Sequence, residues 1–111
     1  MIVTNKTNIL EKVDEKMLLI SILGSLEAIK NQAVTIDEVE KFIFSPHMVK
    51  SLTEKKCNER IVDIIEKGCE LEDIYALMPE KLDGVINELK EETILILKNY
   101  EVYSKMFWLE L

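Results

Sequence analysis

Apolar residues recur every three or four positions over two long stretches, one near each end of the chain. The N-terminal stripe runs from Ile9 to Leu23, and the C-terminal stripe runs without a break from Leu82 to Tyr100. This spacing places side chains on one face of an α-helix and differs from the alternation of a half-buried strand. Because the chain has only three glycines and two prolines, it also lacks the turn residues of a sandwich or barrel. We therefore expect an all-α fold, an irregular bundle of five to six helices with long first and last helices.

Local signals predict where several helices begin. Asn8 and Glu11 have the spacing of a capping box before the first long helix, which is expected to reach about residue 30. Thr35 and Glu38 have the same spacing before a second helix. A serine followed by proline at residues 45–46 is typical of a third helix start. Further helices are expected over about residues 58–67 and 70–77, and the last long helix is expected to begin at residue 79.

Two glycines have predicted structural roles. Gly68 follows a predicted helix and is expected to end it in the left-handed conformation. Gly24, with its neighbour Ser25, is small enough to let another helix cross the first helix closely.

Length and composition predict a single domain over residues 1–111, with its core at about 8–100 and an aromatic tail at 101–111. The most apolar stretch, residues 17–26, is far shorter than the roughly 20 residues that cross a bilayer. The first residues lack the charged start and apolar run of a signal peptide. We therefore expect a cytoplasmic protein.

Residues that carry out catalysis or bind metals are sparse. The chain has one histidine, His47, and two cysteines, Cys57 and Cys69, without the spacing of a zinc site. Its three glycines are isolated from one another, so no phosphate-binding loop is present. We expect no catalytic residue, no metal, no cofactor, and reduced thiols packed within the fold.

Negative charge is concentrated in one third of the sequence. The formal net charge is −7, and residues 61–93 contain ten acids against three lysines, so this segment carries all of it. An acidic protein is a poor ligand for nucleic acid or anionic lipid, and it attracts cationic protein surfaces. Because short connections join these helices, the acids are expected to lie close together, either as a docking face or as a solubility surface. The candidate protein-binding residues are Asp63, Glu66, Glu70, Glu72, Asp73, Glu80 and Asp83.

A second candidate interface is the C-terminal aromatic cluster. Four of the seven aromatic residues lie in the last twelve positions, and aromatic side chains are common binding hot spots. The secondary candidates are Tyr103, Phe107 and Trp108. The alternative is that this tail folds back and closes the core.

Three segments carry a family resemblance: LGSLEAIKN at 23–31, IDEVEK at 36–41 with the Ser-Pro pair at 45–46, and ELEDI at 70–74 with PEKL at 79–82. They are similar to a small bacterial family of unknown function, and the resemblance covers about residues 15–98. It implies a single-domain helical protein and identifies no binding residue. Families of this sort include immunity proteins that neutralise secreted or contact-delivered toxins.

These observations lead to two functional hypotheses. The first is a non-catalytic immunity or antitoxin-type inhibitor that blocks a basic bacterial toxin through its acidic helical face. The alternative is a helical adaptor or regulatory protein that binds a host protein through its aromatic C-terminal segment. Both leave the oligomeric state open.

Overall fold

The structure is a computed structural model that describes residues 9–103. Every regular element within these residues is helical, which confirms the all-α prediction. Along the chain the elements are α2 (Lys12–Lys30), α3 (Ile36–Phe42), α4 (Pro46–Glu54), α5 (Glu59–Gly68), α6 (Leu71–Leu77), the 3-10 turn η1 (Pro79–Lys81) and α7 (Leu82–Leu97).

The body of the bundle has four helices, α2, α4, α5 and α7, each of nine residues or more. The predicted count of five to six bundle helices is therefore wrong. The physical reason is length, because α3 and α6 have seven residues each and connect the longer helices at one end of the molecule. The first and last helices in the described chain are the longest, with 19 and 16 residues.

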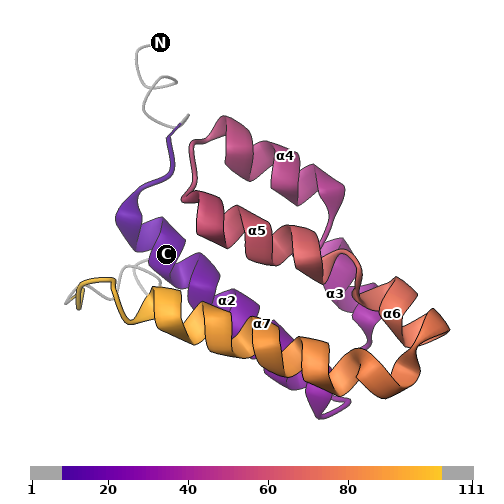
Figure 1. The fold of residues 1–111 in the computed structure, drawn as a ribbon. Coiled ribbons are helices and arrows are strands. Elements are labelled where there is room, and N and C mark those ends of the chain that lie inside the picture. Colours follow the sequence, from indigo (N-terminus) through magenta and orange to yellow (C-terminus); the bar gives the residue numbers. More distant parts are fainter. Residues whose placement is uncertain (1–8, 104–111) are drawn as a thin grey trace.

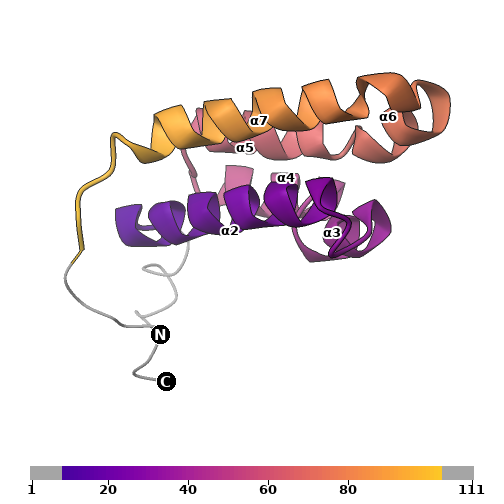
Figure 2. The ribbon, with the colours of Figure 1, turned by 90° about the horizontal axis from the view of Figure 1, so that it is seen from below.

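Helix α2 makes its most extensive contacts with α7, and α5 lies against both α7 and α4 (Figure 1). Figure 2 shows α2 and α3 on one side of the molecule and α5, α6 and α7 on the other. Fully buried aliphatic side chains from both sides fill the space between them: Leu19, Ile22, Leu26, Ile61, Ile64, Ile65, Leu71, Ile86 and Ile96. Each such side chain contributes roughly 1.5–3 kcal/mol by leaving water. No helix among residues 9–103 combines the length and apolar character that a bilayer crossing requires.

Caps fix several helix starts where the sequence predicted them. The Thr35 hydroxyl accepts a hydrogen bond from the Glu38 amide at 3.1 Å, and the Glu38 carboxylate accepts one from the Thr35 amide at 2.9 Å. Ser45 caps α4, with Pro46 as its first residue. The first helix begins later than predicted, at Lys12. Its cap residue is Glu11, whose side chain makes no cap hydrogen bond, and the predicted cap Asn8 lies outside the described residues.

The predicted helix end at Gly68 is confirmed, but its left-handed conformation and the packing role of Gly24 are wrong. No glycine in the described chain has a positive φ; Gly68 is instead the last residue of α5, and a Cβ there would lie 2.5 Å from the Phe44 ring. Its role is to admit that ring. Gly24 is exposed, and a Cβ there would meet nothing within 4 Å, because α2 packs through other residues such as Leu26.

A buried carboxylate joins three elements at the end of the bundle where the described chain begins and finishes. Glu15 on α2 is only 3% exposed. Its two oxygens accept hydrogen bonds from the backbone amide of Asn58 at 2.8 Å and from the Tyr100 hydroxyl at 2.7 Å. The Lys12 ammonium lies 3.7 Å from the carboxylate. We call Glu15, Asn58 and Tyr100 the latch. Because a buried charge is tolerated only with such partners, the latch ties α2 to the start of α5 and to the chain after α7.

Candidate protein-interaction site

The opposite end of the molecule, which we call the tip, consists of α3, α6, η1 and the first turn of α7 (Figures 1 and 2). Three helices begin here, and each has acids in its first turn. Negative side chains are favourable at helix N-termini because the helix dipole is positive there. Converging helix starts are therefore the local reason that carboxylates gather at the tip.

The carboxylates of α3 and α6 affect one another electrostatically. Burial raises the pKa of Glu40 above its ordinary value, and the nearby carboxylates of Glu72, Asp37 and Asp73 raise it further. The second cause is the effect expected of carboxylates on two helices that lie near one another. Lys41 offsets part of this effect by pairing with Asp37 at 3.1 Å, where both side chains are exposed.

Carboxylates also affect the Cys69 thiol at the junction of α5 and α6. Burial raises the pKa of the Cys69 thiol, and Glu40, Glu66 and Glu70 add to the effect. Glu66 and Glu70, with Asp63, also line a shallow groove against Pro46 of α4. The tip and this groove together contain most of the predicted binding acids.

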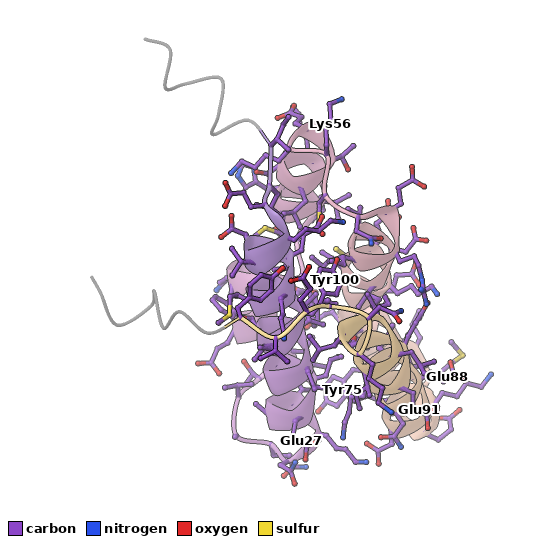
Figure 3. The ribbon with its side chains drawn as sticks, turned by 90° about the vertical axis from the view of Figure 1, so that its left-hand side faces the viewer. Glu27, Lys56, Tyr75, Glu88, Glu91 and Tyr100 are labelled. Carbon is purple, nitrogen blue, oxygen red and sulfur yellow. The ribbon has the colours of Figure 1, made fainter. Side chains whose placement is uncertain are left out.

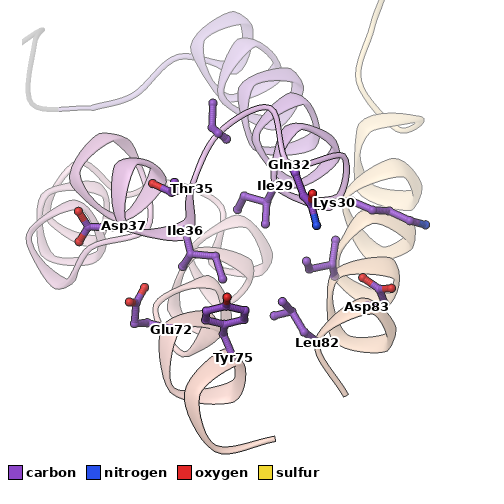
Figure 4. A pocket seen from close by; sticks show the side chains of 12 residues that line it. Ile29, Lys30, Gln32, Thr35, Ile36, Asp37, Glu72, Tyr75, Leu82 and Asp83 are labelled. Atoms are coloured by element: carbon purple, nitrogen blue, oxygen red, sulfur yellow. The ribbon is translucent and has the colours of Figure 1, made fainter. Parts of the chain in front are cut away.

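A pocket of about 360 Å³ opens within the tip (Figure 4). The apolar part of its lining comes from α2, α3 and α7 and includes Ile29, Ile36 and Ile86, and polar side chains such as Gln32 and Thr35 also line it. Tyr75 of α6 also lines the pocket and is 59% exposed. Three carboxylates, one from each helix that begins at the tip, complete the lining: Asp37, Glu72 and Asp83.

The other acids of residues 61–93 are Glu80 on η1, within the tip, and three acids further along α7, Glu88, Glu91 and Glu92. Glu92 on α7 pairs with Lys67 on α5 at 3.5 Å, which joins these two helices. Glu88 and Glu91 are exposed on α7, as Figure 3 shows. Glu80 is exposed on η1, beside the tip pocket's α6 and α7 walls. The segment thus supplies some acids to the tip and others to the flank of α7.

Asp37 and Glu40 are not among the binding acids that the sequence predicts. Both belong to residues 36–60, where acids and bases balance, so the charge count gave no signal. The capping box at Thr35 was the available clue, because it predicted a helix start with acids in its first turn. What the sequence did not show is that this turn lies beside α6.

The C-terminal aromatic residues that the structure describes contact α2. The Tyr100 hydroxyl donates to Glu15, and the Lys16 ammonium lies 5.5 Å from the centre of the Tyr103 ring. The predicted interface residues Phe107 and Trp108 lie outside the described residues. An interface at this segment stays a prediction.

The thiols have properties opposite to those of an activated nucleophile. Burial and the adjacent Glu15 carboxylate raise the pKa of Cys57 to about 12, whereas reactive thiols have lowered pKa values. His47 is exposed on α4. Within residues 9–103, no three His, Cys, Asp or Glu side chains are arranged to hold a metal ion.

Comparison with known proteins relates the chain to a family of unknown function. A family model described as "Protein of unknown function (DUF3969)" matches residues 10–110. No curated protein and no solved structure matches the chain.

Proposed function

Since the chain belongs to this family of unknown function, DUF3969, its own surface is the guide to its role, and we propose that it is a non-catalytic inhibitor that binds a basic protein through the tip. The partner is a cationic toxin domain, and the chain is an immunity or antitoxin-type protein that neutralises it one to one.

The observation that carries this proposal is a pocket at the tip into which three helices each place one carboxylate, Asp37, Glu72 and Asp83. Within residues 9–103, neither Glu72 nor Asp83 forms an ion pair. The helix dipoles favour these acids at the helix starts, and their gathering on one exposed surface also suits a positively charged partner. Exposed carboxylates on one face of a protein complement the charge of a basic protein.

The mechanism is occlusion guided by charge. A toxin that acts on a polyanion needs a cationic surface, and an acidic tip seated on that surface would exclude the substrate. Long-range attraction accelerates encounter, and salt screens it with a Debye length of about 10 Å at 0.1 M. Association is therefore expected to be fast and salt-sensitive.

For the test, the genes beside the one that encodes this chain are searched for a secreted protein, and its basic domain is purified as the partner. Stopped-flow association is measured at low and high salt with the wild-type chain and with the variant Glu70→Lys, Glu72→Lys, Asp73→Lys. The variant should associate at least about tenfold more slowly at low salt, because steering contributes factors of 10 or more to the rate. Coexpression of the wild-type chain should also protect bacterial cells from the toxin domain.

A matched control carries the same change of charge away from the tip: Glu59→Lys, Glu88→Lys, Glu91→Lys, all at exposed helical positions. It should slow association much less than the tip variant. Association that ignores salt, or that is equally slowed by both triple variants, would contradict docking through the tip.

A further inference from the structure

The tip pocket has a chemistry more specific than its negative charge. We propose that it receives an arginine side chain of the protein partner, with the aliphatic stem between the apolar walls and the guanidinium at the acidic mouth. This inference rests on the proposed binding of a basic protein and names the group that anchors it.

The interior of the pocket suits the stem of a long side chain. Ile29, Ile36, Leu82 and Ile86 line it, and they are buried or half-buried. Long cationic side chains pack their methylene groups against such surfaces while the charged end stays near water. A purely acidic patch would give a partner no such apolar contact.

The mouth of the pocket suits a planar cation. In the view of Figure 4, Tyr75 and Leu82 lie between Glu72 on one side and Asp83 on the other. An aromatic ring attracts a cation at its face, and a carboxylate at the edge of the pocket can accept two N–H donors of one guanidinium. Arginine has five such donors in a rigid fork and stacks on aromatic rings, whereas lysine offers a single point charge.

The carboxylates at the mouth are available for such a partner. Among residues 9–103, neither Glu72 nor Asp83 forms an ion pair. Lys30 is the one lysine in the lining, and its ammonium donates to the Asn87 side chain on α7 at 2.7 Å. Figure 4 shows the Lys30 side chain extending away from Tyr75 and Glu72, on the side of the pocket where Asp83 lies.

The test uses two fluorescent lysine–serine peptides of equal net charge. One has a single central arginine; the other has citrulline at that position and one serine replaced by lysine. Citrulline keeps the shape of arginine without its charge. By fluorescence anisotropy at low salt, the arginine peptide should bind the wild-type chain about tenfold more tightly, which is the usual effect of hydrogen bonds to a charged group.

Two pairs of variants locate this preference. Glu72→Gln with Asp83→Asn should abolish the preference for arginine, whereas Glu88→Gln with Glu91→Gln, which removes the same charge from the flank of α7, should preserve it. Tyr75→Ala should weaken the arginine peptide more than the citrulline peptide. Since Glu72, Tyr75 and Asp83 are exposed, all of these variants should fold, and circular dichroism checks that they do.

The outcomes separate this inference from the function it rests on. Equal affinity of the wild-type chain for both peptides, with salt-sensitive binding, would overturn the arginine pocket and leave docking of a basic protein through the tip in place. Arginine preference that survives loss of Glu72 and Asp83 would also overturn it. Lysine–serine peptides that bind no better than an uncharged serine peptide would count against the proposed function itself.

Discussion

The two ends of the bundle use carboxylates in opposite ways. At the latch, Glu15 is 3% exposed and its oxygens accept hydrogen bonds from Asn58 and Tyr100. At the tip, Glu72 and Asp83 are exposed and have no ion-pair partner within the described chain. Negative charge at the latch serves the fold, because its bonds join segments far apart in the sequence.

This difference separates carboxylates whose place is explained by the bonds they accept from carboxylates that have no such partner. A charge that is fully partnered is explained by stability, so it needs no further role. The exposed carboxylates of Glu72 and Asp83 have no ion-pair partner within residues 9–103, and the helix dipole is the local reason for their positions. The two ends therefore make different predictions for stability, and the largest effects belong to the latch.

Glu15→Ala should break the latch and lower the free energy of unfolding by about 3 kcal/mol, since it leaves the Asn58 amide and the Tyr100 hydroxyl without their acceptor. Urea unfolding measures the change. The matched substitution Glu88→Ala, at an exposed position of α7, should stay within about 0.5 kcal/mol. Equal effects of the two substitutions would remove the contrast between buried and exposed carboxylates.

Gly68→Ala tests how firmly the tip is held to the body of the bundle. A Cβ at Gly68 would lie 2.5 Å from the Phe44 ring, so the ring or the end of α5 must move, at a cost of about 2 kcal/mol. Gly24→Ala is the control: its Cβ meets nothing within 4 Å, and it should stabilise α2 by about 0.5–1 kcal/mol. Thermal unfolding should move in opposite directions for the two variants.

Alkaline pH should weaken the latch end through Cys57. Its thiol is 6% exposed, and its pKa rises from 9.0 to about 12, chiefly through burial and then through Glu15. The unfolded chain loses this proton near pH 9 while the folded chain keeps it. Stability is therefore complete below pH 9 and should fall by on the order of 1 kcal/mol per pH unit above it.

The variant Cys57→Ala isolates this contribution. Its unfolding free energy should depend less steeply on pH above about 9 than that of the wild-type chain, whatever its stability at neutral pH. Tyr100, whose pKa is also raised by burial and by its bond to Glu15, steepens the fall in both proteins at higher pH. Parallel pH profiles would contradict a buried, protonated thiol.

The smallest effect belongs to the tip and has the opposite sign to that of Glu15→Ala. Glu40→Gln should stabilise the chain by a few tenths of a kcal/mol at neutral pH, because it removes one of the neighbouring carboxylates of α3 and α6. The raised pKa of Glu40 means that its protonated form favours folding below pH 4.5 and that this benefit is lost as pH rises. The difference from wild type should therefore vanish near pH 4.5, whereas Glu91→Gln should change little at either pH.

Local features of this fold were predictable and long-range ones were not. The caps at Thr35 and Ser45 were found from the sequence because each cap bonds a residue three positions away. The latch bond from Tyr100 to Glu15 joins residues 85 positions apart, and no pattern in the sequence marks it. The same limit hid the role of Gly68, since the ring it admits belongs to Phe44 on another segment.

The candidate site likewise has residues that the sequence predicted and residues that it did not. The sequence identified Glu70, Glu72 and Asp73 because they stand in a segment of unbalanced charge. It missed Asp37 and Glu40 because a balanced segment can still place its acids beside those of another helix. The tip pocket was beyond prediction, since its lining comes from four helices whose packing had to be known first.

The exposed positions around the tip pocket have a consequence for evolution and design. Glu72, Tyr75 and Asp83 lie outside the buried core, on helices whose packing depends on residues such as Leu71 and Ile86. Substitutions at these positions are expected to alter folding little, because surface changes of this kind are usually worth less than about 0.5 kcal/mol. A combinatorial library at these three codons would therefore vary the surface of the pocket on an unchanged scaffold, and natural variants can differ here by the same route.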